Sequence, residues 1–170
     1  MKKLSIALAA TMGLALGGCA TVMNGTNTDY MTQTTPDGAR VTFLNGFECT
    51  TPCELELRRK SDTRADITLD GYEPTYVLIQ SKLGGSTFGN ILLGGGIGAA
   101  IDGGNGASNR LYPRPLIVQL APLGSDEGAM LLDKDGNVLM SVKEHNDTVR
   151  ADVAKTIGAD MAGMTAEGGQ

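Results

Sequence analysis

The 170-residue sequence is poor in aromatic side chains, with no tryptophan, three phenylalanines and four tyrosines. A chain with so few large rings buries less apolar area per residue than an average globular protein. It has 24 glycines instead, and glycine serves turns and close backbone approaches. The composition therefore favours a modest core in which glycines serve backbone geometry.

Histidine occurs only once, at His145. Proton-transfer catalysis commonly uses a histidine or a perturbed carboxylate placed in a cleft. Polar neighbours predict that His145 is a solvated side chain near the start of a helix, with no nucleophile paired to it. The sequence also lacks the Gly-x-Ser-x-Gly motif of a nucleophile elbow. We therefore expect no enzymatic activity and no cofactor.

Basic residues are outnumbered, with 14 Lys and Arg against 19 Asp and Glu. Lys2 and Lys3 precede an N-terminal apolar run, so the chain after that run has 12 basic and 19 acidic residues, a net charge of −7. Nucleic-acid phosphates require a basic face, so we expect no nucleic-acid partner. Net charge is not expected to attract anionic headgroups either, so membrane attachment has to come from a covalent lipid.

The N-terminal apolar run is too short to cross a bilayer. It covers residues 4–16, whereas a hydrocarbon core roughly 30 Å thick requires about 20 residues. Two lysines before the run and small residues after it are typical of a secretory signal. The run ends in Leu16-Gly17-Gly18-Cys19.

That ending resembles the lipobox of bacterial lipoproteins. In that family the signal is removed before the cysteine, whose thiol carries a diacylglycerol and whose amino group is acylated, for example with palmitate. The resemblance implies that residues 1–18 are removed and that Cys19 is lipidated. Ala20 stands where an Asp would retain such a protein at the inner membrane, which implies an outer-membrane location. The alternative is an ordinary signal peptide in which Cys19 occurs by chance.

Residues 19–27 form a short tether before the first expected strand. The eight residues after Cys19 reach at most about 26 to 29 Å when fully extended. We therefore expect the folded domain to lie close to the bilayer surface.

Cys49 and Cys53 are the two other cysteines. An even pair in an oxidising compartment favours a disulfide. Structural zinc uses four ligands, and redox-active pairs use a Cys-x-x-Cys spacing, so both are disfavoured here. Two reduced thiols remain the alternative, and we expect no metal site.

Short segments with alternating apolar residues predict a mainly β fold. Val41 and Phe43 share one face of such a segment, and Asn45-Gly46 follows as a strong hairpin signal. Tight spacing and frequent Pro and Gly favour a small antiparallel β-sandwich. The expected strands are residues 30–34, 39–44, 54–58, 65–69, 75–80 and 116–120.

The turns carry a second resemblance. Pro36-Asp37-Gly38-Ala39, Thr51-Pro52 and residues 70–74 (Asp-Gly-Tyr-Glu-Pro) resemble motifs of the PEGA domain, a small β-sandwich of envelope proteins. The family usually has Glu at the position of Asp37 and a Gly-x-Thr-Pro turn where this chain has Cys49-Thr50-Thr51-Pro52-Cys53. The resemblance covers about residues 28–80 and implies a non-catalytic add-on module.

A glycine-rich insertion covers residues 83–109. Gly94 and Gly98 have the spacing that lets two helices approach closely in a membrane. The apolar part is about 11 residues, roughly 16 Å as a helix, or half a bilayer. We therefore expect a buried or interfacial helix or loop, with an oligomer contact and a true span as alternatives. The candidate membrane or oligomer contacts are Gly94, Gly98, Ile91, Leu92, Leu93 and Ile97.

The order of these features is similar to a group of small proteobacterial lipoproteins without assigned activity. The similarity covers about residues 1–122, runs from the lipobox through the PEGA-like sandwich and the glycine-rich insertion, and implies an envelope location.

Residues 123–170 lie beyond that similarity and are expected to form a hairpin, an amphipathic helix and a frayed tail, with an arm independent of the sandwich as one alternative. The hairpin turns at residues 133–137, where acidic residues raise calcium binding as a weak alternative. Asn146 or Asp147 is the expected helix cap. The apolar residues Val149, Val153, Ile157 and Met161 recur every four positions, which predicts a stripe that lies on the sandwich, on a partner or on the membrane surface.

The sequence therefore predicts a PEGA-like β domain over residues 28–122 in an outer-membrane lipoprotein that faces the periplasm or the cell surface. Its expected role is structural or that of an adaptor for an envelope protein or the cell wall. One alternative is a membrane-active homo-oligomer that uses residues 89–101. A small-ligand or ion-binding module is another.

Overall fold

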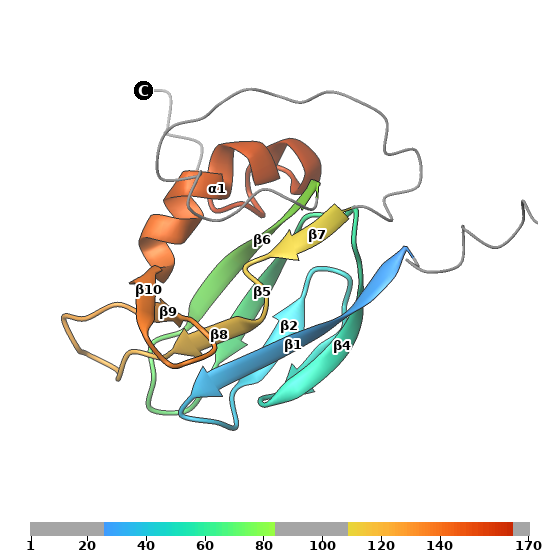
Figure 1. Ribbon diagram of the computed structural model, residues 1–170. Coiled ribbons are helices and arrows are strands. Elements are labelled where there is room, and N and C mark those ends of the chain that lie inside the picture. Colours follow the sequence, from blue (N-terminus) through green and yellow to red (C-terminus); the bar gives the residue numbers. More distant parts are fainter. Residues whose placement is uncertain (1–25, 84–108, 165–170) are drawn as a thin grey trace, which may run out of the picture.

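In the computed structural model, residues 26–83 and 109–164 are described. These residues form ten strands and one helix (Figure 1). Cys19 and the candidate contacts of the glycine-rich insertion lie outside them. The elements are β1 (Asn27–Thr35), β2 (Arg40–Phe43), β3 (Glu48–Thr50), β4 (Cys53–Arg58), β5 (Thr63–Thr68), β6 (Thr75–Leu83), β7 (Asn109–Tyr112), β8 (Leu116–Gln119), β9 (Met130–Leu132), β10 (Val138–Ser141) and α1 (Val142–Ile157).

The strands form two five-stranded sheets, so the expected mainly β fold is confirmed. One sheet has the order β10-β9-β8-β1-β4 and the other β3-β2-β5-β6-β7. The prediction of a purely antiparallel sandwich is wrong at one pair, because β1 and β8 run parallel. The chain crosses from β7 to β8 between the sheets, which brings β8 beside β1 in the same direction.

The core lies between the sheets because alternate residues of each strand point inward. Along β1, Thr28, Tyr30, Thr32 and Thr34 are buried while most residues between them are exposed. The Tyr30 hydroxyl donates a hydrogen bond of 2.6 Å to the Pro113 carbonyl. Tyr30 thus packs in the core, edge-on to Phe43, and links β1 to the segment before β8.

The six expected strands are all present, with ends displaced by up to three residues. Neither β3 nor β7 was predicted as a strand. Each has only three or four residues, too few to show alternation. In β3 only Cys49 is partly buried.

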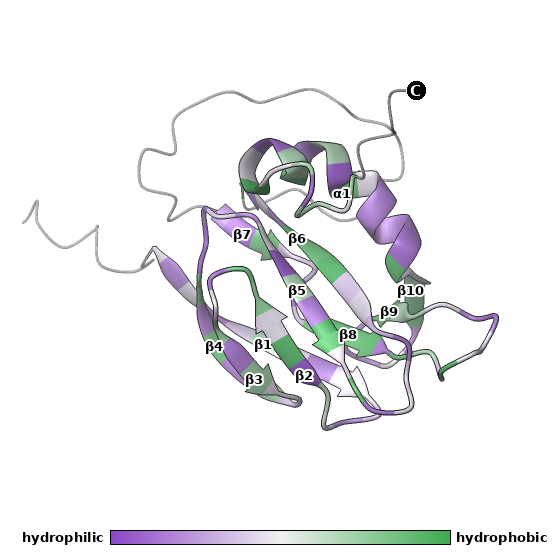
Figure 2. Ribbon diagram, turned by 180° about the vertical axis from the view of Figure 1, so that it is seen from behind, coloured by the Kyte–Doolittle hydropathy of each residue, from purple (hydrophilic) through white to green (hydrophobic). Residues whose placement is uncertain are grey.

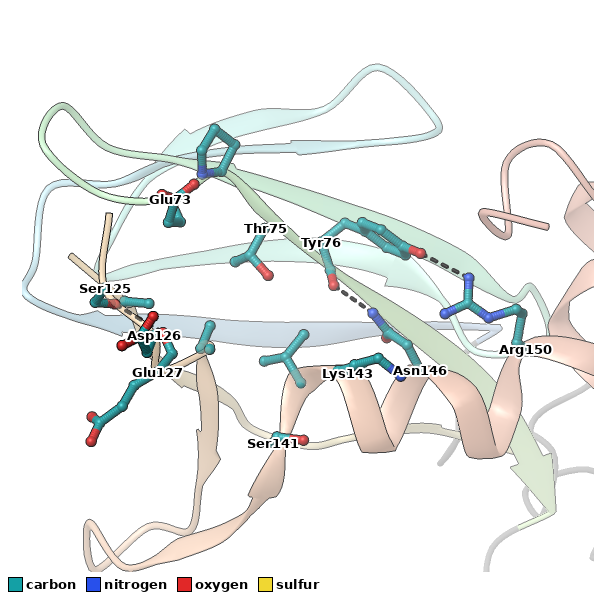
Figure 3. Close-up of a pocket in the computed structure, with 15 residues that line it drawn as sticks. Glu73, Thr75, Tyr76, Ser125, Asp126, Glu127, Ser141, Lys143, Asn146 and Arg150 are labelled. Atoms are coloured by element: carbon teal, nitrogen blue, oxygen red, sulfur yellow. Dashed lines mark hydrogen bonds between the residues drawn. The ribbon is translucent and has the colours of Figure 1, made fainter. Parts of the chain in front are cut away.

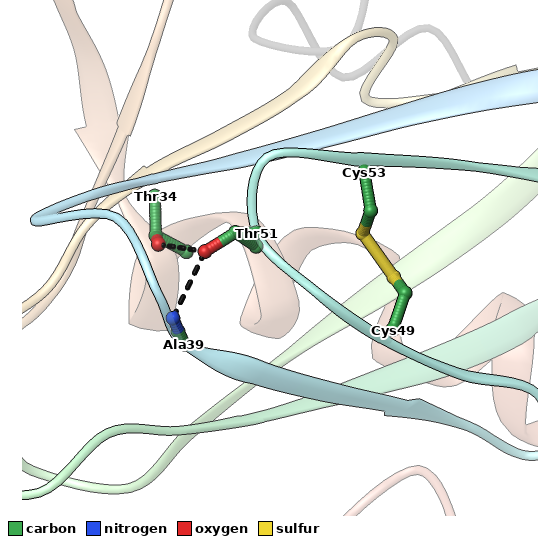
Figure 4. Close-up of a disulfide and its surroundings, with 5 residues drawn as sticks. All are labelled: Thr34, Ala39, Cys49, Thr51 and Cys53. Carbon is green, nitrogen blue, oxygen red and sulfur yellow. Dashed lines mark hydrogen bonds between the residues drawn. A yellow bond between two sulfur atoms is a disulfide. The ribbon is translucent and has the colours of Figure 1, made fainter.

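A disulfide joins Cys49 of β3 to Cys53 of β4, the pairing that the sequence favoured (Figure 4). Since β3 and β4 are the edge strands of different sheets, the bond closes one side of the sandwich. Between the cysteines, the buried Thr51 hydroxyl accepts a hydrogen bond of 3.0 Å from the Ala39 amide. It also bonds to the Thr34 hydroxyl, so three neighbouring segments meet there.

Helix α1 covers part of the other side, against β6 and beside β10. Val149 and Val153 pack with Leu78 of β6 and with Ala162, which follows the helix. Hydrophobic residues of β6 lie beneath a helix whose surface is mixed (Figure 2). The predicted apolar stripe therefore covers β6, although Met161 lies beyond the helix end and is half exposed.

Two expectations for the C-terminal residues are wrong. The helix begins at Val142 with Ser141 as its N-cap, not at Asn146 or Asp147. The C-terminal part is also no independent arm, since β9 pairs with β8 and extends that sheet. The 133–137 turn does connect β9 and β10, as expected.

The sandwich has two distinct ends. At the proximal end β1 begins, β6 ends, β7 begins and α1 ends (Figure 1). The turns at residues 44–47 and 59–62 lie at this end. The distal end carries the connections at residues 36–39, 51–52, 69–74 and 120–129.

Candidate functional site

A groove of about 380 Å³ lies between the first turns of α1, the start of β6 and the connection from β8 to β9 (Figure 3). The wall on α1 includes Lys143, Asn146 and Arg150. Positions three, four and seven apart lie on one face of a helix, so these three side chains share one side of α1. The groove is open at the distal end, away from the start of β1.

Ser141 sets the start of this helical wall. Its side chain oxygen accepts a hydrogen bond of 3.1 Å from the Glu144 amide, which satisfies one of the free amides of the first turn. The Val142 amide donates to the Ala129 carbonyl at 2.8 Å and ties the helix start to the opposite wall. The Ser141 hydroxyl is therefore used for capping.

Asn146 joins the helix to the sheet. Its Oδ1 accepts a hydrogen bond of 2.9 Å from the Leu78 amide, and its Nδ2 donates one of 2.8 Å to the Tyr76 carbonyl. Strand β7 pairs only with residues 80–83 of β6, so this stretch of the β6 edge has no strand beside it. The side-chain amide of Asn146 makes the hydrogen bonds to this edge that a neighbouring strand would otherwise make.

His145 is 2% exposed, so the expectation of a solvated histidine is wrong. Its Nε2 donates a hydrogen bond of 2.8 Å to the Leu78 carbonyl. Burial lowers the pKa of His145, the Leu78 carbonyl raises it and the nearby Lys82 cation lowers it further. The side chain fixes α1 to β6 in its neutral form and does not line the groove.

Arg150 holds the residues that follow the helix. Its Nη1 donates to the Tyr76 hydroxyl at 2.9 Å and to the Ala162 and Gly163 carbonyls at 2.9 and 2.8 Å. Its Nη2 lies 2.8 Å from Asp147, which also pairs with Lys143. Hydrogen bonds from the Lys143 and Arg150 side chains lower the pKa of Asp147, so it is ionised at neutral pH.

The opposite wall is acidic. Its side chains include Glu73, Asp126 and Glu127. Glu73 accepts a hydrogen bond of 2.8 Å from the Gly124 amide, while its own amide donates to the Ala121 carbonyl at 2.9 Å. These bonds hold the 69–74 connection against the 120–129 connection. Asp126 and Glu127 are exposed.

The groove thus places carboxylates opposite a helical wall on which Lys143 and Arg150 are both paired with Asp147. Its two serines serve local structure, since Ser125 donates to the Glu127 carbonyl at 2.9 Å and Ser141 caps the helix. This arrangement suits binding of a chain segment that carries both charges. The sequence prediction missed the groove, and the spacing of Lys143, Asn146 and Arg150 was the signal available for it.

The acidic 133–137 turn is occupied by its own hydrogen bonds. The Asp133 carboxylate accepts bonds from the Asp135 and Asn137 amides, both at 2.8 Å, and from the Asn137 side chain at 3.0 Å. Within residues 26–83 and 109–164, no three His, Cys, Asp or Glu residues are grouped as metal ligands would be.

The one helix of the described residues is too short and too polar to span a bilayer. Comparison with models of protein families, with curated proteins and with solved structures finds no match for this chain.

Proposed function

We propose that this chain is a lipid-anchored envelope protein with a non-catalytic adaptor or structural role. Acyl chains on Cys19 hold it at the outer membrane, facing the periplasm or the cell surface. Its partner is another envelope protein or the cell wall. The observation that carries the proposal is the fixed position of Asn27, where β1 begins eight residues after the lipobox cysteine.

Arg59 fixes that position. Its amide donates to the Thr26 carbonyl at 2.9 Å, and its Nε donates to the Asn27 carbonyl at 2.9 Å. Residues 20–27 reach at most about 26 to 29 Å, so an anchor on Cys19 keeps the proximal end near the bilayer. The groove at the distal end then faces away from the membrane, where a partner has access.

We also propose that the sandwich is PEGA-like. The residues that carry the resemblance contact one another, since the Gly38 amide donates to the Thr51 carbonyl at 2.9 Å and the Thr51 amide donates to the Ala39 carbonyl at 2.9 Å. The Glu73 amide, in the third of these motifs, bonds to the Ala121 carbonyl outside the motifs. These contacts support a module whose turns are fixed to one another by main-chain hydrogen bonds.

The anchor is tested by feeding cells an alkyne analogue of palmitate. We expect label on the wild-type protein and none on Cys19→Ser, which is left with an unprocessed signal. Equal labelling of both proteins, or of neither, contradicts the proposal.

The adaptor role is tested with a photo-crosslinking amino acid at Glu127 in the groove. The matched control places the same amino acid at Glu54, an exposed carboxylate of β4. We expect a discrete crosslinked species from position 127 that is missing from position 54. Identical patterns from both positions contradict a partner at the groove.

A second candidate function is a membrane-active oligomer built on the glycine-rich insertion. It is favoured by the pairing of Leu83 with Asn109, because the insertion leaves and rejoins the fold at the proximal end, next to the tether. Replacing Gly94 and Gly98 by Leu should abolish chemical crosslinking between copies if close helix approach is required. Unchanged crosslinking, or none in the wild type, removes this candidate.

A further inference from the structure

Charge is segregated between the two ends of the sandwich. The four connections at the distal end contain five carboxylates and no basic residue. At the proximal end, the β4–β5 turn and its flank contain Arg58, Arg59 and Lys60, and Arg110 of β7 lies at the same end. The charged residues of the four distal connections are therefore all acidic, whereas the proximal end carries charges of both signs, including Asp62 in the β4–β5 turn.

The basic residues adjoin the tether directly. Arg58 is paired with Asn27 in the β1–β4 ladder, and Arg59 bonds to the carbonyls of Thr26 and Asn27. The Arg59 carbonyl also accepts from Ser81 near the end of β6 at 2.6 Å. Arg58, Lys60 and Arg110 are exposed.

Carboxylates also lie near these cations, and several of them have partners of their own. Asp62 accepts hydrogen bonds from the Ser81 amide and the Thr156 hydroxyl, and Asp152 pairs with Lys155. Lys82 is not counted with the exposed cations, because burial lowers its pKa and Asp152 and Asp62 interact with its charge. Glu56 faces Asp29 across the β1–β4 ladder, on the flank of the sheet.

Exposed apolar side chains accompany the exposed cations. Leu44, Phe47 and Met161 are 39%, 49% and 50% exposed. They border two shallow hollows of about 470 and 510 Å³ that share Arg58 in their walls. A basic surface that includes large apolar side chains has the composition of a membrane-interface site.

We propose that the proximal end docks on an anionic lipid surface, with Arg58, Lys60 and Arg110 at the headgroups and Phe47 and Leu44 in the interface. This rests on the proposed anchor at Cys19, whose short tether keeps this end near lipid. The net charge of −7 expected for the processed chain opposes docking mainly through the carboxylates near this end, such as Asp29, Glu56 and Asp62. The distal carboxylates lie about 30 Å away along the nine-residue β1, about three screening lengths at 0.1 M salt.

The absence of tryptophan makes a direct test possible. Phe47→Trp places a single fluorophore at the proximal end, and Leu123→Trp places one at the distal end, where Leu123 is 65% exposed. Each full-length acylated protein is reconstituted in phosphatidylethanolamine vesicles that contain phosphatidylglycerol and a brominated lipid. We expect quenching and a blue shift for Phe47→Trp and neither for Leu123→Trp.

Charge is tested in the Phe47→Trp background. Replacing Arg58 and Lys60 by Gln should reduce the ratio of docked to undocked protein roughly five-fold per charge removed, as should replacing phosphatidylglycerol by phosphatidylcholine. Lys134→Gln, an exposed lysine in the β9–β10 turn, is the matched control and should leave quenching unchanged. Circular dichroism shows that each variant is folded.

Mass spectrometry of the reconstituted protein separates the two proposals. If Cys19 is acylated and Phe47→Trp is quenched no more than Leu123→Trp, docking is wrong while the anchor stands. If quenching is independent of Arg58, Lys60 and anionic lipid, the proposed recognition is wrong. If Cys19 carries no acyl chain, the anchor and the docking geometry that depends on it both fail.

Discussion

At the scale of single residues, Asn146 and His145 attach α1 to the edge of β6. Both are almost fully buried, and both bond to the main chain of that strand. A sheet edge that lacks a neighbouring strand exposes main-chain donors and acceptors. These two side chains form hydrogen bonds with the main-chain groups of β6 that have no partner strand, because β7 does not extend that far.

Asn146→Ala should lower the free energy of unfolding by about 2 kcal/mol, because it leaves the buried Leu78 amide and Tyr76 carbonyl without these partners. Thr148→Ala is the control on the same helix, since the Thr148 side chain is exposed, and should change stability by less than about 0.5 kcal/mol. Urea denaturation measures both. Equal effects of the two substitutions would show that the Asn146 bonds contribute little.

Protonation of His145 should destabilise the fold, because burial lowers its pKa below the unfolded value. The unfolded chain binds the proton more readily, so stability is complete above about pH 6.5 and falls as the pH drops below it, by at most about 1.4 kcal/mol per pH unit. Urea denaturation at about pH 7.5 and 5.5 measures this loss. His145→Gln keeps a donor and should lose the pH dependence, whereas an identical dependence in this variant would assign it to other groups.

His145 was predicted to be solvated because the start of the helix was placed too late in the sequence. A cap at Asn146 or Asp147 leaves His145 outside the helix, among polar residues. The actual cap is Ser141, which places positions 142, 145, 146, 149 and 153 on one buried face. The apolar stripe at Val149 and Val153 was predictable from periodicity, but burial of two polar residues depended on the unpaired edge of β6, a tertiary feature.

At the scale of elements, the sequence predicted the longer strands because alternation of apolar residues reports one buried face. It did not predict β3 and β7, which are too short, or the parallel pairing of β1 with β8. That pairing depends on where the chain crosses between sheets, for which the local pattern carries no signal. The groove was missed for the same reason, since its walls come from segments distant in the chain.

The disulfide between β3 and β4 should contribute to stability. Its cysteines are four positions apart, and the entropy of closing so short a loop corresponds to about 2 kcal/mol. Cys49→Ala combined with Cys53→Ala should lower stability by about that amount and keep the fold, because Thr51 still bonds to Ala39 and Thr34. Thermal denaturation with and without dithiothreitol checks this. No effect of reductant on the wild type would show that the bond does not stabilise the sandwich.

At the scale of the whole molecule, the domain has two chemically different ends. The proximal end combines the tether with exposed cations and apolar side chains, and the distal end combines acidic connections with the groove. Net charge and composition do not reveal this polarity, because it appears only when the turns are assigned to one end or the other. In the function that we propose, the proximal end faces the membrane and the distal end faces a partner.

Lengthening the tether tests that arrangement. Inserting about twelve Gly and Ser residues between Met23 and Asn24 should leave acylation intact. It should reduce the effective concentration of the proximal end at the bilayer about four-fold, because effective concentration falls as roughly the −3/2 power of linker length. The quenching of Phe47→Trp in brominated vesicles should decrease accordingly. Unchanged quenching would show that the tether length does not position the domain.

The most direct test of the central claim is mass spectrometry of the N-terminal peptide after expression in a Gram-negative bacterium. The account predicts a peptide that begins at Cys19 and carries the mass of a diacylglycerol on its thiol and an acyl chain on its amino group. A mature protein that begins elsewhere, or one with a free thiol at Cys19 in the soluble periplasmic fraction, would contradict it.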